Sequence, residues 1–212
     1  AAGATAIGAL GTKAVAAYAD YEQLVGGVET LFKDSQDQVM DYANNAYKTA
    51  GLSANEYMET VTSFSASLLQ SLDGDTSAAA DKANLAITDM SDNANKMGTD
   101  MSSIQNAYQG FAKQNYTMLD NLKLGYGGTQ AEMERLLADA EKISGIKYDI
   151  SSYADIVDAI HVVQTEMGIT GTTAEEAAST IQGSFGMMKS AWQNLVTGMA
   201  DPSQDLGVLV GN

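Results

Sequence analysis

Few residues of this chain could carry catalytic or metal-binding chemistry. The 212-residue sequence contains one histidine and no cysteine. Thiol nucleophiles, thiolate ligands and disulfides are therefore excluded, and so is a zinc site with two histidines. A Ser-His-Asp arrangement would depend entirely on His161. This residue follows Ile160 in an apolar helical pattern, so we expect a packed or rim histidine and not a catalytic base.

Two short motifs resemble ligand-binding loops but are incomplete. Asp73-Gly74-Asp75-Thr76 has the start of a calcium loop but not the later ligands or the closing glutamate of an EF-hand. The glycine-rich run 124–128 is not followed by the Gly-Lys-Ser/Thr of a phosphate-binding loop. We expect the first to link two helices and the second to turn sharply, with Tyr126 against the protein.

Pairs of acidic residues also have an ordinary explanation. Asp139 with Glu141, and Glu175 with Glu176, fall on expected helices, either on the solvent face or in a first turn where the helix dipole favours them. No pair is set apart as the two carboxylates of a glycosidase. The sequence therefore predicts no enzyme activity, no catalytic or cofactor-binding residue, no metal site and no cofactor.

The charge of the chain restricts its partners. There are 27 acidic and 11 basic residues, which gives a formal net charge of −16. A nucleic-acid-binding surface needs clustered Lys and Arg, so direct binding to nucleic acid is disfavoured. No apolar run approaches the roughly 18 residues of a membrane-spanning helix.

Apolar residues recur at three- and four-residue intervals along most of the chain, and the single proline is at position 202. This pattern predicts an all-α fold: a multi-helix bundle of about eight helices joined by short Gly/Ser/Asp loops, with no sheet. The longest stripe, from Ile7 to Phe32, predicts a helix that needs neighbours to cover it. We divide the chain into a long N-terminal amphipathic helix (1–33), a helical bundle module (34–200) and the truncated start of a further element (201–212), as expected for a fragment of a longer protein.

Three expected helix starts share one pattern. They are Gly51-x-Ser53-x-x-Glu56, Gly127-x-Thr129-x-x-Glu132 and Gly171-x-Thr173-x-x-Glu176. Each combines a glycine that ends one helix, a hydroxyl residue that begins the next, and a glutamate that reaches back to it. Capping chemistry alone accounts for the pattern, and a degenerate repeat is the alternative.

Further stop and start signals divide the rest of the chain. Asp73-Gly74-Asp75 and Gly98 should each end a helix, and Ser152 should begin one. The helix that starts near residue 101 should bend at Gly110 and Asn115 and continue to residue 122. The last helix should run unbroken from residue 173 to residue 199.

The largest apolar side chains of the helical stripes should form a packing and interaction seam, with Trp192 as the core anchor of the last helix. The expected seam residues are Tyr18, Tyr21, Val25, Val28, Phe32, Tyr57, Val61, Phe64, Leu68, Ile181, Phe185 and Trp192.

Three runs resemble phage tail tape measure proteins, in the versions found in phages and prophages of Gram-positive bacteria. The runs are 16–28, which contains Tyr21-Glu22, then 50–57, and finally 108–129, which reads from Tyr108-Gln109-Gly110-Phe111 to Gly125-Tyr126-Gly127-Gly128-Thr129. The first is a loose motif, whereas the third is long and fairly specific. The resemblance extends through Trp192-Gln193-Asn194-Leu195 and so covers nearly the whole chain.

The resemblance implies a structural role. A tape measure protein sets the length of the phage tail while tube subunits polymerise around it, and it leaves the tube at genome ejection. The implied partners are the tail tube, the tail tip and assembly chaperones. Self-association stays open, and contact with the host membrane would occur only at ejection. The implied location is the lumen of the virion tail, after synthesis in the host bacterial cytoplasm. The family carries no catalytic residues over to this chain.

Two other readings stay open. A secreted helical effector or toxin-delivery domain of a Gram-positive bacterium would share the Cys-free, acidic composition. One such family has a Trp-x-Gly turn, whereas here Trp192 is followed by Gln193-Asn194. An enzyme is disfavoured by the histidine and cysteine content.

A continuous helix of 212 residues would span on the order of 320 Å. The dense stop signals instead predict a folded module attached to the part of the protein that measures the tail.

Overall fold

In the computed structural model, residues 2–179 and 181–198 are described, with side-chain surroundings for 16–179 and 186–197. Within these ranges the fold is all-α and contains no strand, which confirms the predicted fold class. The α-helices are α1 (Ala2–Phe32), α2 (Gln36–Thr49), α3 (Ala54–Ser71), α4 (Thr76–Met97), α5 (Met101–Phe111), α6 (Gln130–Ser144), α7 (Tyr153–Glu166), α8 (Thr172–Ser179) and α9 (Ile181–Gly198). Two 3-10 helices are η1 (Lys33–Ser35) and η2 (Leu119–Leu122).

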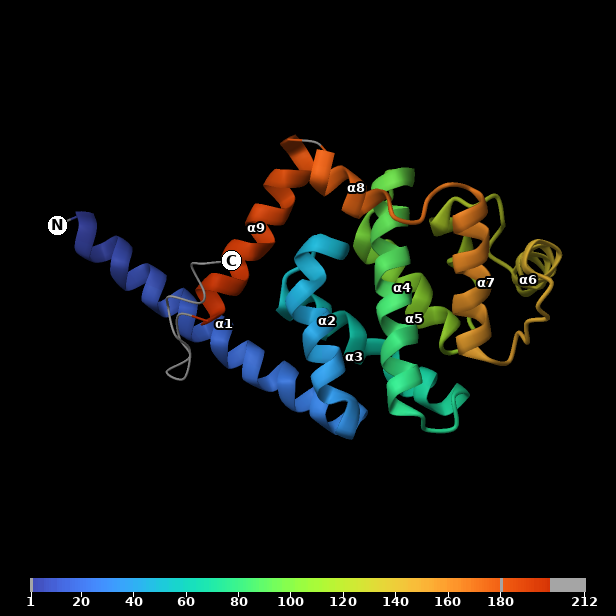
Figure 1. Ribbon diagram of the computed structural model, residues 1–212, viewed down its shortest axis with the longest axis horizontal. Coiled ribbons are helices and arrows are strands. Elements are labelled where there is room, and N and C mark those ends of the chain that lie inside the picture. The colour runs from blue at the N-terminus through green and yellow to red at the C-terminus, as the bar shows by residue number, and fades with distance from the viewer. Residues whose placement is uncertain (1, 180, 199–212) are drawn as a thin grey trace.

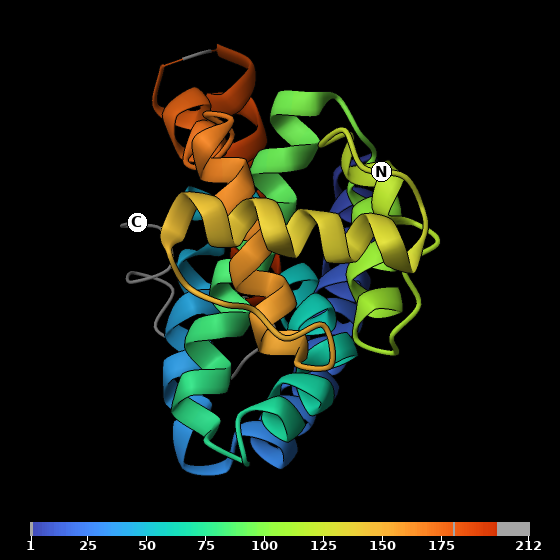
Figure 2. The same cartoon turned by 90° about the vertical axis from the view of Figure 1, so that its right-hand side faces the viewer.

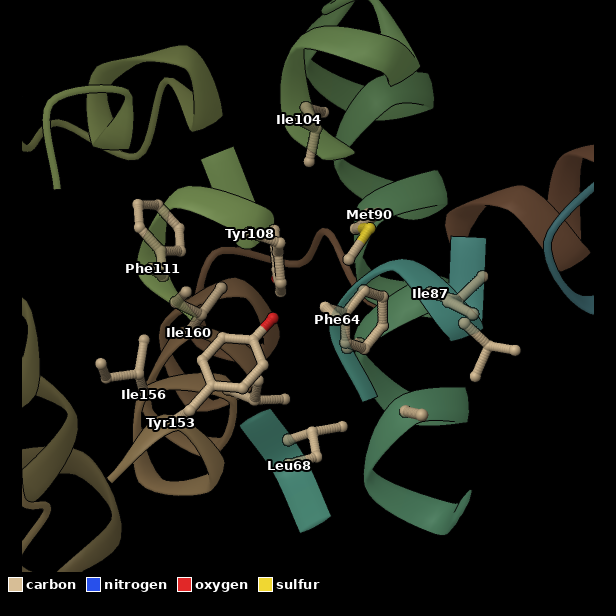
Figure 3. Packing of buried hydrophobic residues seen from close by; sticks show 14 of the residues in the cluster. Phe64, Leu68, Ile87, Met90, Ile104, Tyr108, Phe111, Tyr153, Ile156 and Ile160 are labelled. Atoms are coloured by element: carbon tan, nitrogen blue, oxygen red, sulfur yellow. The ribbon is translucent and has the colours of Figure 1, made fainter. Parts of the chain in front are cut away.

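Helix α4 lies at the centre of the molecule (Figure 1) and contacts α1, α2, α3, α5, α7 and α8. Its alanine-rich sequence allows this, because small side chains let neighbouring helices approach on several sides. Figure 3 shows large apolar side chains converging on this region from α3, α4, α5 and α7. Phe64 lies edge-on to Tyr153, with ring centroids 6.1 Å apart. Several buried residues on each helix thus join the four elements into one core.

Several predicted helix ends are confirmed. Ser53 forms a complete capping box with Glu56 at the start of α3. Gly98 ends α4 in the left-handed conformation, with φ 60°. The Ser152 side chain accepts a hydrogen bond from the Asp155 amide at the start of α7. Each of these signals acts within a few residues, which is why the sequence alone reveals it.

The helix from residue 101 does not bend as predicted; it ends. Helix α5 stops at Phe111, and the Asn115 amide donates to the Gly110 carbonyl at 2.9 Å. A Cβ on Gly110 would lie 2.9 Å from the Asn115 carbonyl oxygen. The glycine therefore permits a close return of the chain at this point. Met118 is consequently exposed beside η2 and does not extend a helical stripe.

The predicted last helix is two helices, α8 and α9, on either side of residue 180. Trp192 is not a core anchor, because 55% of it is exposed, and Met188 is 58% exposed. Helix α9 is held through polar groups: Asn194 Oδ1 accepts from the Ala54 amide at 2.9 Å, and the Ser190 hydroxyl donates to the Gly51 carbonyl at 2.9 Å. The predicted element 201–212, Met199 and the side chains of Ile181 and Phe185 lie outside the described residues.

Candidate functional site: buried polar residues of α4

The predicted seam of α1 and α3 is largely a packing face. Val28 and Phe32 of α1 are buried, as are Tyr57, Val61, Phe64 and Leu68 of α3. Tyr18, Tyr21 and Val25 are only partly buried, and the two tyrosine rings stack with centroids 6.1 Å apart. The two helices lie against one another, and the Asn55 side chain donates to the Ala17 carbonyl at 3.2 Å. Among the described seam residues, Trp192 alone is exposed.

The densest group of buried polar side chains was not predicted. It consists of Asp89, Ser91, Asp92 and Asn93, which are 0%, 8%, 0% and 1% exposed. We call these four residues the α4 polar cluster. They lie in the C-terminal half of α4, where other helices surround it. Because a buried polar group is costly without a partner, the contacts of each member define what the cluster does.

Asp92 caps a helix that begins far away in the sequence. One carboxylate oxygen accepts from the Gly171 amide at 2.6 Å, and the other accepts from the Thr173 amide at 2.8 Å. These are donors at the start of α8, where amides lack partners within the helix and where the dipole favours negative charge.

This geometry corrects the prediction for Thr173. Helix α8 begins at Thr172, so Thr173 lies in its first turn and does not precede it. The acceptor for the Gly171 and Thr173 amides comes from α4, through the buried Asp92 carboxylate. The motif 127–132 is also only partly as predicted. Thr129 does accept from the Glu132 amide, but Glu132 Oε2 accepts from the Gly127 amide at 2.9 Å and not from Thr129.

Asp89 pairs with His161 of α7. Both carboxylate oxygens lie 3.0 Å from the imidazole Nδ1. Burial raises the pKa of Asp89, and the hydrogen bond to the histidine partly opposes this. The hydrogen bond to Asp89 in turn raises the pKa of His161 above its ordinary value, with a further contribution from the charge of Asp158. The pair therefore retains one proton to a higher pH than a free histidine would.

The expectation of a rim histidine agrees with this position, since 30% of the His161 side chain is exposed. Lys82 and Asp158 form a second ion pair between α4 and α7. The lysine charge lowers the pKa of His161 and so opposes the effect of the carboxylates. Two charged pairs thus join α4 and α7. The Asp89–His161 pair has a buried carboxylate, and the Lys82–Asp158 pair lies at the surface.

The other two members of the cluster bind backbone carbonyls. The Ser91 hydroxyl donates to the Ala50 carbonyl, 2.6 Å away at the end of α2. The side-chain amide of Asn93 donates to the Leu122 carbonyl of η2 at 3.0 Å. Both acceptors lie at the ends of helical segments, where carbonyls have no partner within the helix. The α4 polar cluster therefore connects α4 to α2, η2, α7 and α8.

This arrangement is suited to holding helices in place. In the described part of the chain, no group of three or more His, Asp or Glu residues has the geometry of a metal site. Asp73 and Asp75 belong to the turn before α4, with Asp75 accepting from the Ala78 amide at 2.9 Å. No described helix is long and apolar enough to cross a membrane.

The sequence contains a weak signal for the cluster. Asn93 continues the row of Ala79 and Ala86 at seven-residue spacing, and Asp89 lies one turn after Ala86. A helix buried on several sides has more than one buried row. The apolar stripe through Ala83 and Met90 marks only one of these rows and so does not reveal the polar residues beside it.

Comparison of the chain with protein-family models, with curated proteins and with solved structures finds no match.

Proposed function

We propose that this chain is a folded module of a phage tail tape measure protein, a structural protein that sets tail length during assembly and leaves at genome ejection. The observation that carries the proposal is the resemblance of residues 108–129 to that family, together with the structural demands on those same residues. A resemblance based on composition alone would not require particular residues at particular places.

Gly128 illustrates these demands. A Cβ at this position would lie 2.3 Å from the Thr117 carbonyl oxygen, which is far inside contact distance. Only glycine fits without movement of the backbone. Together with Gly110, it allows the chain between α5 and α6 to fold back closely on itself.

Two of the three tyrosines of the same stretch attach it to its surroundings. Tyr116 donates to the Ile150 carbonyl at 3.1 Å, and Tyr126 donates to Asp139 at 3.1 Å. The Arg135 guanidinium lies 4.3 Å from the centroid of the Tyr126 ring. Residues 108–129 therefore place α5, α6 and the segment before α7 relative to one another. This supports reading the motif as the signature of a particular fold element.

The arrangement of the helices favours a module over a straight ruler. As one continuous helix the chain would span on the order of 320 Å. A compact chain of this length has a radius of gyration of about 17 Å. The acidic surface also suits a protein that shares the tail tube with DNA, because like charges limit adhesion to the genome.

Deleting this module in frame from the phage genome tests the proposal. We expect tails shortened by much less than the on-the-order-of 320 Å of an extended helix, with defects in assembly or genome delivery instead. Electron microscopy of purified phage measures the tails. The matched control deletes an equal number of residues from an uninterrupted helical part of the same protein, and should shorten tails by the full helical length.

Two outcomes would overturn the proposal. Tails shortened by the full length would support the tape assignment but reject the folded module. Absence of the protein from purified virions, combined with its secretion by cells that carry no active phage, would reject the tape assignment in favour of a secreted helical protein.

A further inference from the structure

A groove of about 640 Å³ lies between α6 and the segment that joins it to α7. Figure 2 shows α6 crossing the outer face of α7, with the connecting segment curving beneath it. The groove is lined on one side by Leu137 and Ala138 of α6, and on the other by Tyr148 and Ile150. Its volume is within the range of sites that hold a ligand or several side chains of a partner.

The floor of the groove is apolar and fixed in place. Leu137 is 5% exposed and belongs to the core, and Tyr148 and Ile150 pack against that core. Ile143 near the end of α6 and Ile146 just after it are 46% and 60% exposed, although neither lines the groove. An apolar surface of this kind, continuous with a firm core, is typical of docking sites.

The rim of the groove is acidic. Glu134, Glu141, Asp149 and Asp155 line it, against a single base, Lys147. A partner that brought basic side chains to this rim would therefore gain charge complementarity with these carboxylates.

The two bases of α6 are used elsewhere on the helix. Arg135 pairs with Glu132 at 2.6 Å, and Lys142 pairs with Asp139 at 2.7 Å. None of these four residues lines the groove. The two rim acids of α6, Glu134 and Glu141, are therefore not paired with the bases of their own helix.

We propose that this groove binds a basic amphipathic helix of a partner protein. Glu134 and Glu141 are seven residues apart, so they lie on one face of α6, separated by about 10.5 Å along the axis, with Ala138 between them. A partner helix with Lys or Arg seven residues apart, and aliphatic residues between them, would pair with both carboxylates and place its apolar row against Ala138 and the floor. A second copy of this chain is a poor occupant, because each copy carries a net charge of −16.

This inference does not depend on the proposed function, and a synthetic peptide tests it. The probe is a labelled amphipathic helical peptide with Lys pairs seven residues apart flanking a Leu row, titrated with the full chain by fluorescence anisotropy. We expect saturable binding, weakened about tenfold or more by Glu134→Lys combined with Glu141→Lys. The matched control, Asp41→Lys with Glu59→Lys, makes the same change in net charge at exposed positions of α2 and α3, and should change the affinity less than about twofold.

A second pair of variants tests the shape of the groove without changing its charge. Ala138→Trp should fill the groove and weaken binding about tenfold or more. Ala131→Trp, at an exposed position of α6 that does not line the groove, should leave binding unchanged. Methyl NMR should place the peptide, with shifts at Leu137 and Ile150.

Three results would overturn the proposal. The first is equal binding of a scrambled peptide of the same composition, which would indicate attraction to acidic charge alone. The second is equal weakening by the groove variants and their controls, or methyl shifts away from the groove. The third is concentration-dependent dimerisation of the chain that Glu134→Lys with Glu141→Lys abolishes, which would assign the groove to a second copy.

Discussion

Replacing Asp92 with alanine should destabilise the protein far more than the loss of an ordinary helix cap. The Asp92 side chain is fully buried and accepts from the Gly171 and Thr173 amides. Alanine would leave both amides without an acceptor, and each unpaired buried donor costs about 1–3 kcal/mol. Part of this cost is offset, because the variant no longer buries a carboxylate. We expect a net loss of about 2–4 kcal/mol in the free energy of unfolding.

Two measurements check this expectation. Urea denaturation followed by circular dichroism gives the free energy of unfolding. Hydrogen exchange gives the protection of the two amides, which should fall in the variant while protection in the core of α3 changes only with global stability. Asp92→Asn keeps one acceptor oxygen but turns an NH₂ group toward the second amide. This variant should therefore also have a measurably lower free energy of unfolding.

Asp75→Ala is the matched control, because Asp75 caps α4 in the same way but at the surface, through the Ala78 amide. It should cost about 1 kcal/mol and leave the amides of α8 protected. A loss below about 1 kcal/mol for Asp92→Ala, or unchanged exchange at Gly171 and Thr173, would refute the view that α8 is capped from α4.

Three further predictions concern the core, the buried pair and the glycine turn. Phe64→Ala should cost about 3–5 kcal/mol in chemical denaturation, because this side chain is 3% exposed, and a loss under about 1 kcal/mol would contradict its place in the core. The pKa values of His161 and Asp89 are both raised in the fold, so the stability they provide is present at lower pH and is lost as pH rises through the folded pKa of the histidine. The free energy of unfolding should therefore decline as pH rises from the ordinary pKa of histidine, 6.5, through the higher folded pKa of His161, and Asp89→Asn should flatten this decline. Gly128→Ala should cost at least about 1–3 kcal/mol, because its Cβ would meet the Thr117 carbonyl at 2.3 Å.

The glycine prediction has an internal control. Gly186 lies in α9, and a Cβ there would meet nothing within 4 Å. Gly186→Ala should therefore be neutral or stabilising by about 0.5–1 kcal/mol. Equal effects at the two positions would show that chain entropy, and not the close approach of the backbone, determines the response.

The sequence by itself determined the fold class and most of the helix ends. Three- and four-residue spacing of apolar side chains produced the helices, and Ser53, Gly98 and Ser152 cap them as expected. These signals are local, because a cap and the groups that it binds lie within a few residues of one another. The segment containing Tyr126 was likewise predictable as a tight turn packed against the protein.

Only the tertiary structure decided which polar residues are buried and which apolar ones are exposed. Asp92 meets the start of α8 from 79 residues away, and Asp89 meets His161 from 72 residues away. No local sequence pattern specifies contacts between residues so far apart in the chain. Thr173 was expected to precede the helix, but it lies in the first turn of α8, and its amide binds the distant Asp92 carboxylate. Trp192 satisfies the helical period of α9, yet it is exposed, because periodicity shows which residues share a face and not whether another element covers that face.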